Sequence, residues 1–111
     1  MPLPNGLYKV TWDTPAGTEY GVAYLLDGRL RGGDSGLCYV GTYQQQGQLF
    51  TAEMSVTRHR HVPGAIAALG LDDVLVELTG VVEEGAALRV RGTSPESSAV
   101  RFSARLAMIA D

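Results

Sequence analysis

Apolar and polar residues alternate with a period of two along most of this chain, as they do in strands that bury one face. The longest example is Gln48–His59, in which Phe50, Ala52, Met54 and Val56 alternate with polar residues. Short clusters of Gly, Pro, Asp and Gln separate the alternating segments. The pattern predicts eight strands, over Gly6–Asp13, Thr18–Leu26, Arg29–Gly33, Gly36–Gln44, Gln48–His59, Asp72–Val82, Ala86–Thr93 and Ser98–Ile109.

The turns between these segments predict that consecutive strands pair with each other. Asp27-Gly28 is the strongest hairpin signal, because a type I′ turn needs positive φ at both of its central residues. The other expected turns are Thr14–Gly17, Gln45–Gly47, Glu83–Gly85 and Ser94–Ser97. The alternation breaks once, at Pro63–Gly70, which we interpret as one helical turn or a packed crossover loop between the fifth and sixth strands.

Eight short strands with short connections favour an all-β, up-and-down antiparallel barrel, because closure removes the exposed edges of the sheet. We expect a single domain over residues 1–111, which is long enough to bury a core without disulfides. The interior of an eight-stranded barrel is either filled by side chains or holds one small ligand, and the sequence leaves both alternatives open.

Composition and charge narrow the function classes. Apolar residues are 45% and charged residues 19% of the chain, which is typical of a folded soluble protein. The net charge of −3 comes from scattered residues, so direct nucleic-acid binding is not expected. Cys38 is the single cysteine, which favours a reducing, cytoplasmic location. We expect no signal peptide, because the opening residues 1–5, Met-Pro-Leu-Pro-Asn, have neither a basic region nor an apolar stretch. We expect no membrane span, because no apolar run reaches the roughly 20 residues that cross a bilayer.

Residues 58–61, with the sequence Arg-His-Arg-His, are the cluster that most resembles a metal site. His59 and His61 lie on one face of an extended strand, and two imidazoles at that spacing can share a metal ion. A catalytic zinc site has three protein ligands, and Glu53 or Glu77 would have to supply the third through the fold. The flanking arginines would repel a cation. We therefore interpret the cluster as a solvated strand end, or as a weak contact for an anionic ligand or partner.

Gly32–Asp34 resembles the start of the diguanylate cyclase signature, but Ser35-Gly36 follows it in place of Glu-Phe. The chain is also far too short for that domain. We interpret the two glycines as a bulge or corner at which the strand turns sharply.

The remaining polar residues do not form a catalytic pattern. Ser35 and Ser55 lack a nucleophile elbow, and Cys38 is interpreted as a small buried residue. The acidic pairs Asp72-Asp73 and Glu83-Glu84 are expected to be solvated at strand edges and turns. We expect no catalytic residue, no metal and no cofactor.

Four blocks in the first half of the chain follow one another in the order found in a known family. They are Asn5–Val10, Tyr20–Ala23, Asp27–Asp34 and Tyr39–Tyr43. The chain resembles the GrlR family of negative regulators of type III secretion, in which an (N/D)G(I/L)Y opening strand precedes an NG…GGD…Y.G block. The match is specific over residues 5–43, and over the later strands it rests on strand order and length.

The resemblance implies a bacterial, lipocalin-like barrel that assembles as a homodimer and has no enzymatic activity. The best-known member represses virulence genes by binding a transcriptional activator and holding it inactive. It recognises its partner through an acidic Glu-Asp-Glu-Asp hairpin between the fourth and fifth strands. This chain has Gln44-Gln45-Gln46-Gly47 at that place, so the carboxylates that would attract an arginine-rich partner are absent.

The resemblance and the residues together leave three hypotheses for the function, of which the first is the one that the resemblance implies. The first is a cytoplasmic, non-enzymatic regulator that binds a transcriptional regulator by protein–protein contact, with Gln44, Gln45, Gln46, Gly47 and Gln48 as the contact surface. The second is a small carrier that binds an apolar ligand inside the barrel, lined by Tyr8, Trp12, Phe50, Met54 and Phe102. The third is an enzyme or a metal site built on His59 and His61.

Overall fold

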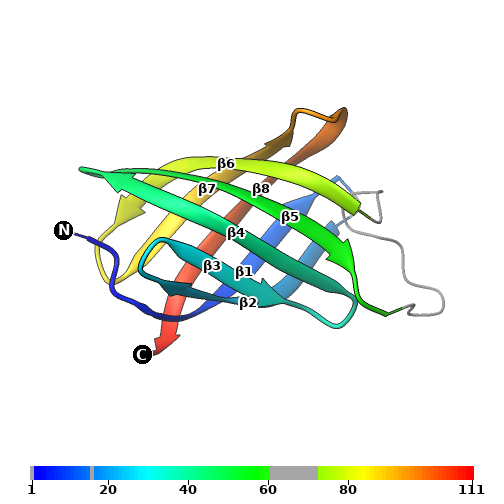
Figure 1. Cartoon of the computed structure of the whole chain (residues 1–111). Helices are drawn as coiled ribbons and strands as arrows, with labels where there is room; N and C mark the ends of the chain where they lie inside the picture. The colour runs from blue at the N-terminus through cyan, green and yellow to red at the C-terminus, as the bar shows by residue number, and fades with distance from the viewer. Residues whose placement is uncertain (1, 16, 61–72) are drawn as a thin grey trace.

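The computed structural model describes residues 2–15, 17–60 and 73–111, and the described chain forms eight strands (Figure 1). They are β1 (Gly6–Thr14), β2 (Gly17–Leu26), β3 (Arg29–Gly33), β4 (Leu37–Gln46), β5 (Leu49–Arg58), β6 (Asp73–Glu83), β7 (Ala87–Ser94) and β8 (Ser97–Ala110). Each strand pairs antiparallel with the next, and β8 pairs with β1, so the sheet closes. The predicted eight-stranded up-and-down barrel is confirmed, and its form fits the lipocalin-like expectation.

The inward side chains of all eight strands form one apolar core. The residues predicted to face inward on β5 and β8, from Phe50 to Val56 and from Val100 to Leu106, are buried as expected. Aromatic rings fill much of the space between the strands. The ring centroid of Trp12 lies 4.9 Å from that of Tyr39 and 4.8 Å from that of Phe102. This packing follows directly from the period-two alternation, because every second side chain points into the barrel.

Glycines within the strands allow neighbouring backbones to approach each other closely. A Cβ atom on Gly41 would collide with the carbonyl oxygen of Glu53 on β5, and it would lie 2.7 Å from the Cα of Met54. A Cβ on Gly32 would likewise collide with the carbonyl oxygen of Val22 on β2. The pairing of β3 with both of its neighbours is unbroken at Gly32 and Gly33, so these glycines serve close approach and do not form the expected bulge.

The Asp27-Gly28 turn has the predicted geometry. Asp27 has φ of 47° and Gly28 has φ of 86°, which are the positive values that a type I′ hairpin requires. The side chain of Asn5, which precedes β1, supports the turn, because its Nδ2 donates to Asp27 Oδ1 and its Oδ1 accepts from the Asp27 backbone N–H, both at 3.0 Å. The hairpin is therefore held both by its own backbone and by the segment before β1.

The hairpin between β4 and β5 turns later than predicted. Strand β4 continues to Gln46, which pairs with Leu49, so Gly47 and Gln48 alone form the turn. The expected turn at Gln45–Gly47 is wrong because glutamine fits a strand ladder, and Gly47 is the residue with a left-handed φ, of 61°. The other strand ends lie within one residue of the predicted ones. Pro63–Gly70, expected as a helical turn or loop, lies outside the described residues.

The N-terminal segment lies at the end of the barrel that also carries the β4–β5 turn (Figure 1). Leu3 is buried against the core, and its backbone N–H donates to Gln45 Oε1 at 2.8 Å. The Tyr8 hydroxyl donates to the Pro4 carbonyl oxygen at 2.7 Å. These contacts cover one mouth of the barrel. In the described part of the chain, no helix is long and apolar enough to cross a membrane.

Candidate functional site

In the glutamine hairpin, residues 44–48, one residue is half-buried and the other four are exposed. Gln44, Gln46, Gly47 and Gln48 are exposed. Gln45 is half-buried, and its amide accepts the N–H of Leu3 and donates to the Gly47 carbonyl oxygen at 2.9 Å. Four of the five residues expected to contact a partner are therefore accessible, whereas Gln45 holds the N-terminal segment in place.

The residues expected to line a ligand cavity all lie in the barrel interior and are buried: Tyr8, Trp12, Phe50, Met54 and Phe102. A void among the inward side chains, lined by apolar residues that include Trp12, Met54 and Phe102, has a volume of about 20 Å³. Ligand pockets usually measure about 300–1,000 Å³, and even one water needs polar partners. In this structure the five residues are therefore core residues.

Asp34 organises the loop between β3 and β4. Its Oδ1 accepts the backbone N–H groups of Gly36 and Leu37 at 2.9 and 2.8 Å. Its Oδ2 accepts the hydroxyl of Tyr39 at 2.7 Å. The ring Nε2 of His59 lies 3.0 Å from the backbone carbonyl oxygen of Asp34, which links the loop to the end of β5. The aspartate of the Gly32–Asp34 motif thus has a structural role.

The phenol of Tyr39 is held in its neutral form. Burial raises its pKa above the usual value of about 10, and the hydrogen bond to Asp34 raises the pKa further. The Trp12 indole N–H lowers the pKa of Tyr39, although this buried N–H forms no well-aligned hydrogen bond with the described residues. The net effect is a hydroxyl that remains a hydrogen-bond donor to Asp34.

The structure brings no metal site together within its described ranges. No three His, Cys, Asp or Glu side chains gather there as ligands would. His59 is exposed, and His61 lies outside the described residues, so the pair is not placed. Cys38 is half-buried between Leu37 and Tyr39, which are buried, so the expectation of a buried cysteine is wrong. It lies on the outer face of β4, where a side chain is covered only by its neighbours.

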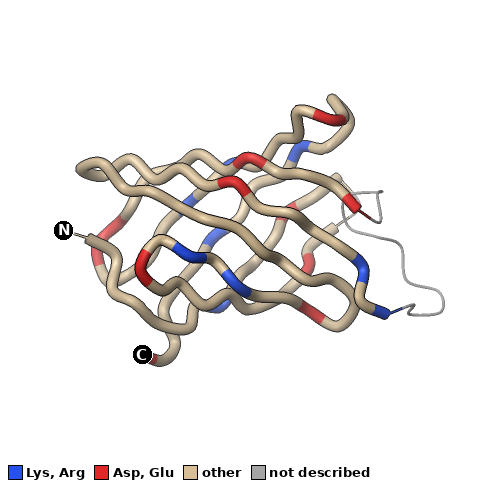
Figure 2. The backbone as a smooth tube through the Cα atoms, viewed as in Figure 1, with Lys and Arg blue, Asp and Glu red and all other residues tan. Residues whose placement is uncertain are grey.

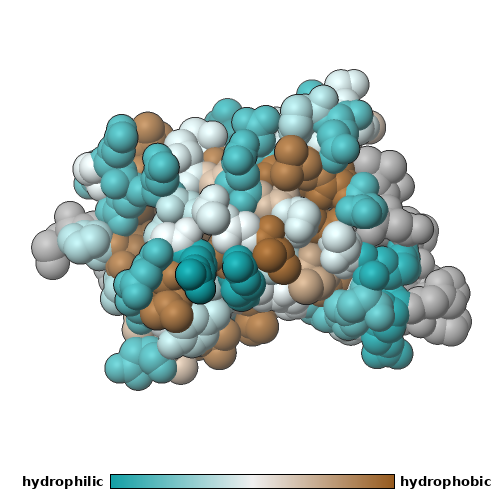
Figure 3. All heavy atoms as spheres, in the orientation of Figure 1, coloured by the Kyte–Doolittle hydropathy of each residue, from teal (hydrophilic) through white to brown (hydrophobic). Residues whose placement is uncertain are grey.

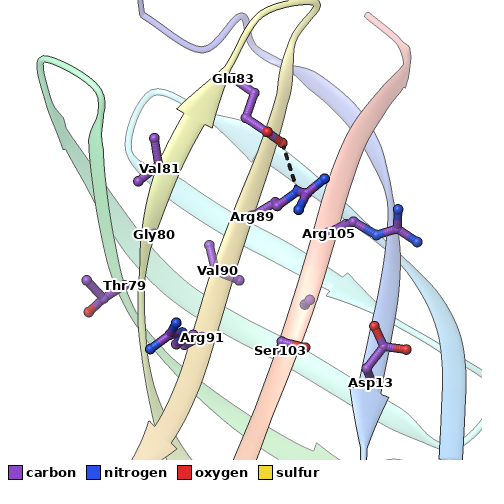
Figure 4. A pocket seen from close by; sticks show the side chains of 11 residues that line it. Asp13, Thr79, Gly80, Val81, Glu83, Arg89, Val90, Arg91, Ser103 and Arg105 are labelled. Atoms are coloured by element: carbon purple, nitrogen blue, oxygen red, sulfur yellow. Dashed lines mark ion pairs between the residues drawn. The ribbon is translucent and has the colours of Figure 1, made fainter.

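A large hollow, which we call the outer groove, crosses the outside of β6, β7, β8 and β1 (Figure 4). Its volume is about 830 Å³. Five charged side chains line it: Asp13, Glu83, Arg89, Arg91 and Arg105. Gly80 lies in its floor, where the missing side chain lets β6 and β7 approach each other.

The strand register arranges the outward residues in and beside the outer groove in two rows across four strands. One row is Val81, Arg89, Arg105 and Thr11, and the other is Thr79, Arg91, Ser103 and Asp13. Neighbours in a row have Cβ atoms about 5 Å apart. Arg89 and Arg105, which belong to different strands and are distant in sequence, therefore lie directly opposite each other.

One ion pair crosses the groove wall. Arg89 Nε lies 3.3 Å from Glu83 Oε1, and 68% and 46% of these side chains are exposed (Figure 4). Such an exposed pair contributes little to stability and exchanges readily for another partner. Arg105 extends toward β1 and Arg91 toward β6 in the same view. The three arginines are thus presented to a group that approaches from outside.

Glu53 and Glu77 form an acidic patch beside the outer groove. They are direct cross-strand partners on β5 and β6 (Figure 2). They line a smaller hollow of about 290 Å³, and Thr79 contributes to both hollows. Like charges directly opposite each other are unfavourable in a sheet. The outside of the barrel therefore holds an acidic pair on β5 and β6 and an arginine pair on β7 and β8.

The outer groove is not evident from the sequence. The alternation of Arg89 and Arg91 with Leu88 and Val90 does indicate that these arginines point outward. The sequence indicates nothing further about the groove, because alternation within a strand does not show which residue of the next strand lies opposite. The pairing of Arg89 with Arg105 follows from the register of β7 and β8.

Comparisons with known proteins do not place the chain in a family. No family model matches it, and no curated protein matches it. The resemblance to the GrlR family thus rests on the blocks within residues 5–43, and the function that it implies is a proposal.

Proposed function

We propose that this chain is a non-enzymatic, cytoplasmic regulatory protein that binds a transcriptional regulator by protein–protein contact, as members of the GrlR family do. One contrast supports binding at the outer surface: the interior void is about 20 Å³, whereas the outer groove is about 830 Å³. The outer surface of the barrel therefore has room for a bound partner, whereas the interior does not. The resemblance suggests type III secretion as the regulated process.

A pull-down with the tagged chain, from a lysate of the source organism, tests this function. We expect one DNA-binding regulator to be retained in stoichiometric amount. Recovery of the chain alone, under gentle conditions and with excess lysate, would contradict the proposal.

The exposed part of the glutamine hairpin is the contact surface that the resemblance implies. Gln46→Arg combined with Gln48→Arg is expected to weaken retention of the partner at least about fivefold, which corresponds to roughly 1 kcal/mol. The reason is that two long cations would replace neutral amides on the exposed side of the turn. Glu84→Arg in the β6–β7 turn is the matched control, and equal retention by both variants removes the hairpin from the contact surface.

The resemblance also implies a homodimer, and the outer face of β2 offers an apolar surface for one. Tyr20, Val22, Tyr24 and Leu26 alternate along this strand and are all exposed, Tyr20 at 72%. Over β3 to β6, by contrast, hydrophobic side chains reach the surface in separate places between polar ones (Figure 3). A continuous row of large apolar side chains is typical of an interaction surface. We propose that a second copy covers it.

Tyr20→Lys combined with Tyr24→Lys is expected to convert the dimer to a monomer, because two charges would be buried at the interface. Size-exclusion chromatography with light scattering measures the change as a halving of mass. Leu49→Lys, at an exposed apolar position of β5, is the control and should leave the mass unchanged. A wild-type chain that is monomeric throughout the micromolar range would rule out the dimer.

The alternative function, a carrier of an apolar ligand, receives no support from the described interior. Trp12, Met54 and Phe102 pack around a void too small for such a ligand. Native mass spectrometry of the purified protein checks this directly, since a co-purified molecule would favour the carrier.

A further inference from the structure

We infer that the outer groove binds an acidic, extended segment of a protein partner through Arg89, Arg91 and Arg105. This inference rests on the proposed function, because it assigns the chemistry of the partner to one surface of the barrel. The surface is distinct from the glutamine hairpin, which lies at one end of the barrel (Figure 1).

Positive charge is concentrated on one side of a chain that is acidic as a whole. Strands β7, β8 and β1 carry one acidic residue, Asp13, and five basic ones: Lys9, Arg89, Arg91, Arg101 and Arg105. The rest of the chain carries four basic and eleven acidic residues. The three strands therefore present a positive field to an approaching anion.

The position of Arg89 and Arg105 favours the binding of a carboxylate. Arg89 and Arg105 are direct cross-strand partners, and like charges in that position repel each other. Glu83 pairs with Arg89 from β6, two strands away from Arg105, and the pair is largely exposed. A carboxylate that both side chains turn to meet would reduce the repulsion and accept N–H donors from them. The two cross-strand arginines therefore favour an anion that approaches from outside the barrel.

The lining of the groove favours a protein segment over a nucleic acid. Asp13 and Glu83 also line the groove and would repel a continuous phosphate backbone. Among the described lining residues there is no aromatic side chain on which a base could stack. Val81, in contrast, is exposed and offers apolar contact. Three strand spacings of about 4.8 Å make the groove about 14 Å wide, which fits four or five extended residues.

A fluorescence anisotropy titration of the full chain tests the inference. The probe is a fluorescein-labelled peptide, Gly-Glu-Val-Glu-Val-Glu-Gly, and its comparison is the same peptide with Gln in place of Glu. We expect saturable binding of the acidic peptide that weakens as salt is added, and no binding of the neutral one. Arg89→Gln combined with Arg105→Gln should weaken the affinity at least about tenfold.

The matched control is Arg29→Gln combined with Arg60→Gln, which removes two exposed arginines outside the groove. Affinity within about twofold of wild type is expected for this control. Thermal melting of each variant verifies that it is folded, and little change is expected because the replaced side chains are exposed.

Two results of the titration would overturn the inference: no saturable binding of the acidic peptide, or an equal loss of peptide affinity in the control variant. Two further results would also overturn it. They are equal affinity for a labelled thymidine hexanucleotide, and self-association of the chain that the Arg89→Gln, Arg105→Gln variant abolishes. The last two would assign the groove to a general polyanion or to a second copy.

The pull-down separates this inference from the proposed function. If the wild-type chain retains a regulator and the Arg89→Gln, Arg105→Gln chain retains it equally well, the groove assignment fails and the function stands. If the wild-type chain retains none while the peptide titration succeeds, the function fails and the groove remains a site for acidic segments.

Discussion

Replacement of Gly41 by alanine is expected to lower the free energy of unfolding by about 3 kcal/mol, at the upper end of the usual cost of overpacking. The added Cβ would collide with the Glu53 carbonyl oxygen and lie 2.7 Å from both the Cα and the Cβ of Met54. Because the first two of these atoms are backbone, a side-chain rotation cannot relieve the contact. Strands β4 and β5 would have to separate and lengthen their hydrogen bonds. Urea denaturation followed by far-UV circular dichroism measures the loss.

Gly47→Ala is the control for this experiment. Gly47 has a left-handed φ, of 61°, but a Cβ atom added there would have nothing within 4 Å of it. The expected loss is about 1 kcal/mol, which is the cost of the left-handed conformation alone. Equal denaturation midpoints for Gly41→Ala and wild type would mean that β4 and β5 do not approach as closely as described.

Replacement of Asp34 by alanine, which removes its carboxylate, is expected to lower the free energy of unfolding by a similar amount, about 3 kcal/mol. Three hydrogen bonds disappear, from the N–H groups of Gly36 and Leu37 and from the hydroxyl of Tyr39. Hydrogen bonds to a charged group contribute about 1.5–3 kcal/mol each, and the partial exposure of Asp34 reduces their sum. The buried Tyr39 hydroxyl would also lose its acceptor. The same denaturation experiment measures the effect, with the exposed Glu84→Ala as control.

The stability of the protein is also expected to depend on pH through Tyr39, and the Tyr39→Phe variant tests this expectation. The pKa of Tyr39 is raised in the folded state by burial and by the bond to Asp34, so the folded protein holds the phenol proton more tightly than the unfolded chain. The resulting stabilisation is complete below the unfolded pKa of about 10 and is lost as the pH rises above it. Wild type should therefore lose more stability than Tyr39→Phe between neutral pH and pH values above about 10. Parallel curves for the two proteins would contradict the Asp34–Tyr39 contact.

The strands and the core could be predicted from local pattern. In Gln48–His59 the side chains of Phe50, Ala52, Met54 and Val56 occupy the buried face, and the structure buries all four. The Asp27-Gly28 turn was equally predictable, because positive φ restricts the residues that can form it. The β4–β5 turn lies later than predicted because glutamine has no strong preference between strand and turn. The pairing of β4 with β5 therefore continues to Gln46 and Leu49.

The candidate sites were less accessible to prediction. Four residues of the glutamine hairpin are exposed, but Gln45 is half-buried, and its contact with Leu3 joins segments far apart in the chain. The interior residues were placed correctly inside the barrel. Whether they enclose a cavity depends on how side chains of several strands interlock, which a single sequence does not reveal.

The sequence by itself determined that this protein is an eight-stranded antiparallel barrel, because alternation within each strand and the short turns between strands are local properties. The tertiary structure decided the rest. Only the register between strands places Arg89 opposite Arg105 and Glu53 opposite Glu77, and only the closure of β8 on β1 brings Asp13 to the same groove. Charges that are scattered along the chain thereby become an arginine groove beside an acidic patch. A period of two sets the face on which a residue lies, whereas its neighbours across the sheet depend on where each strand begins to pair.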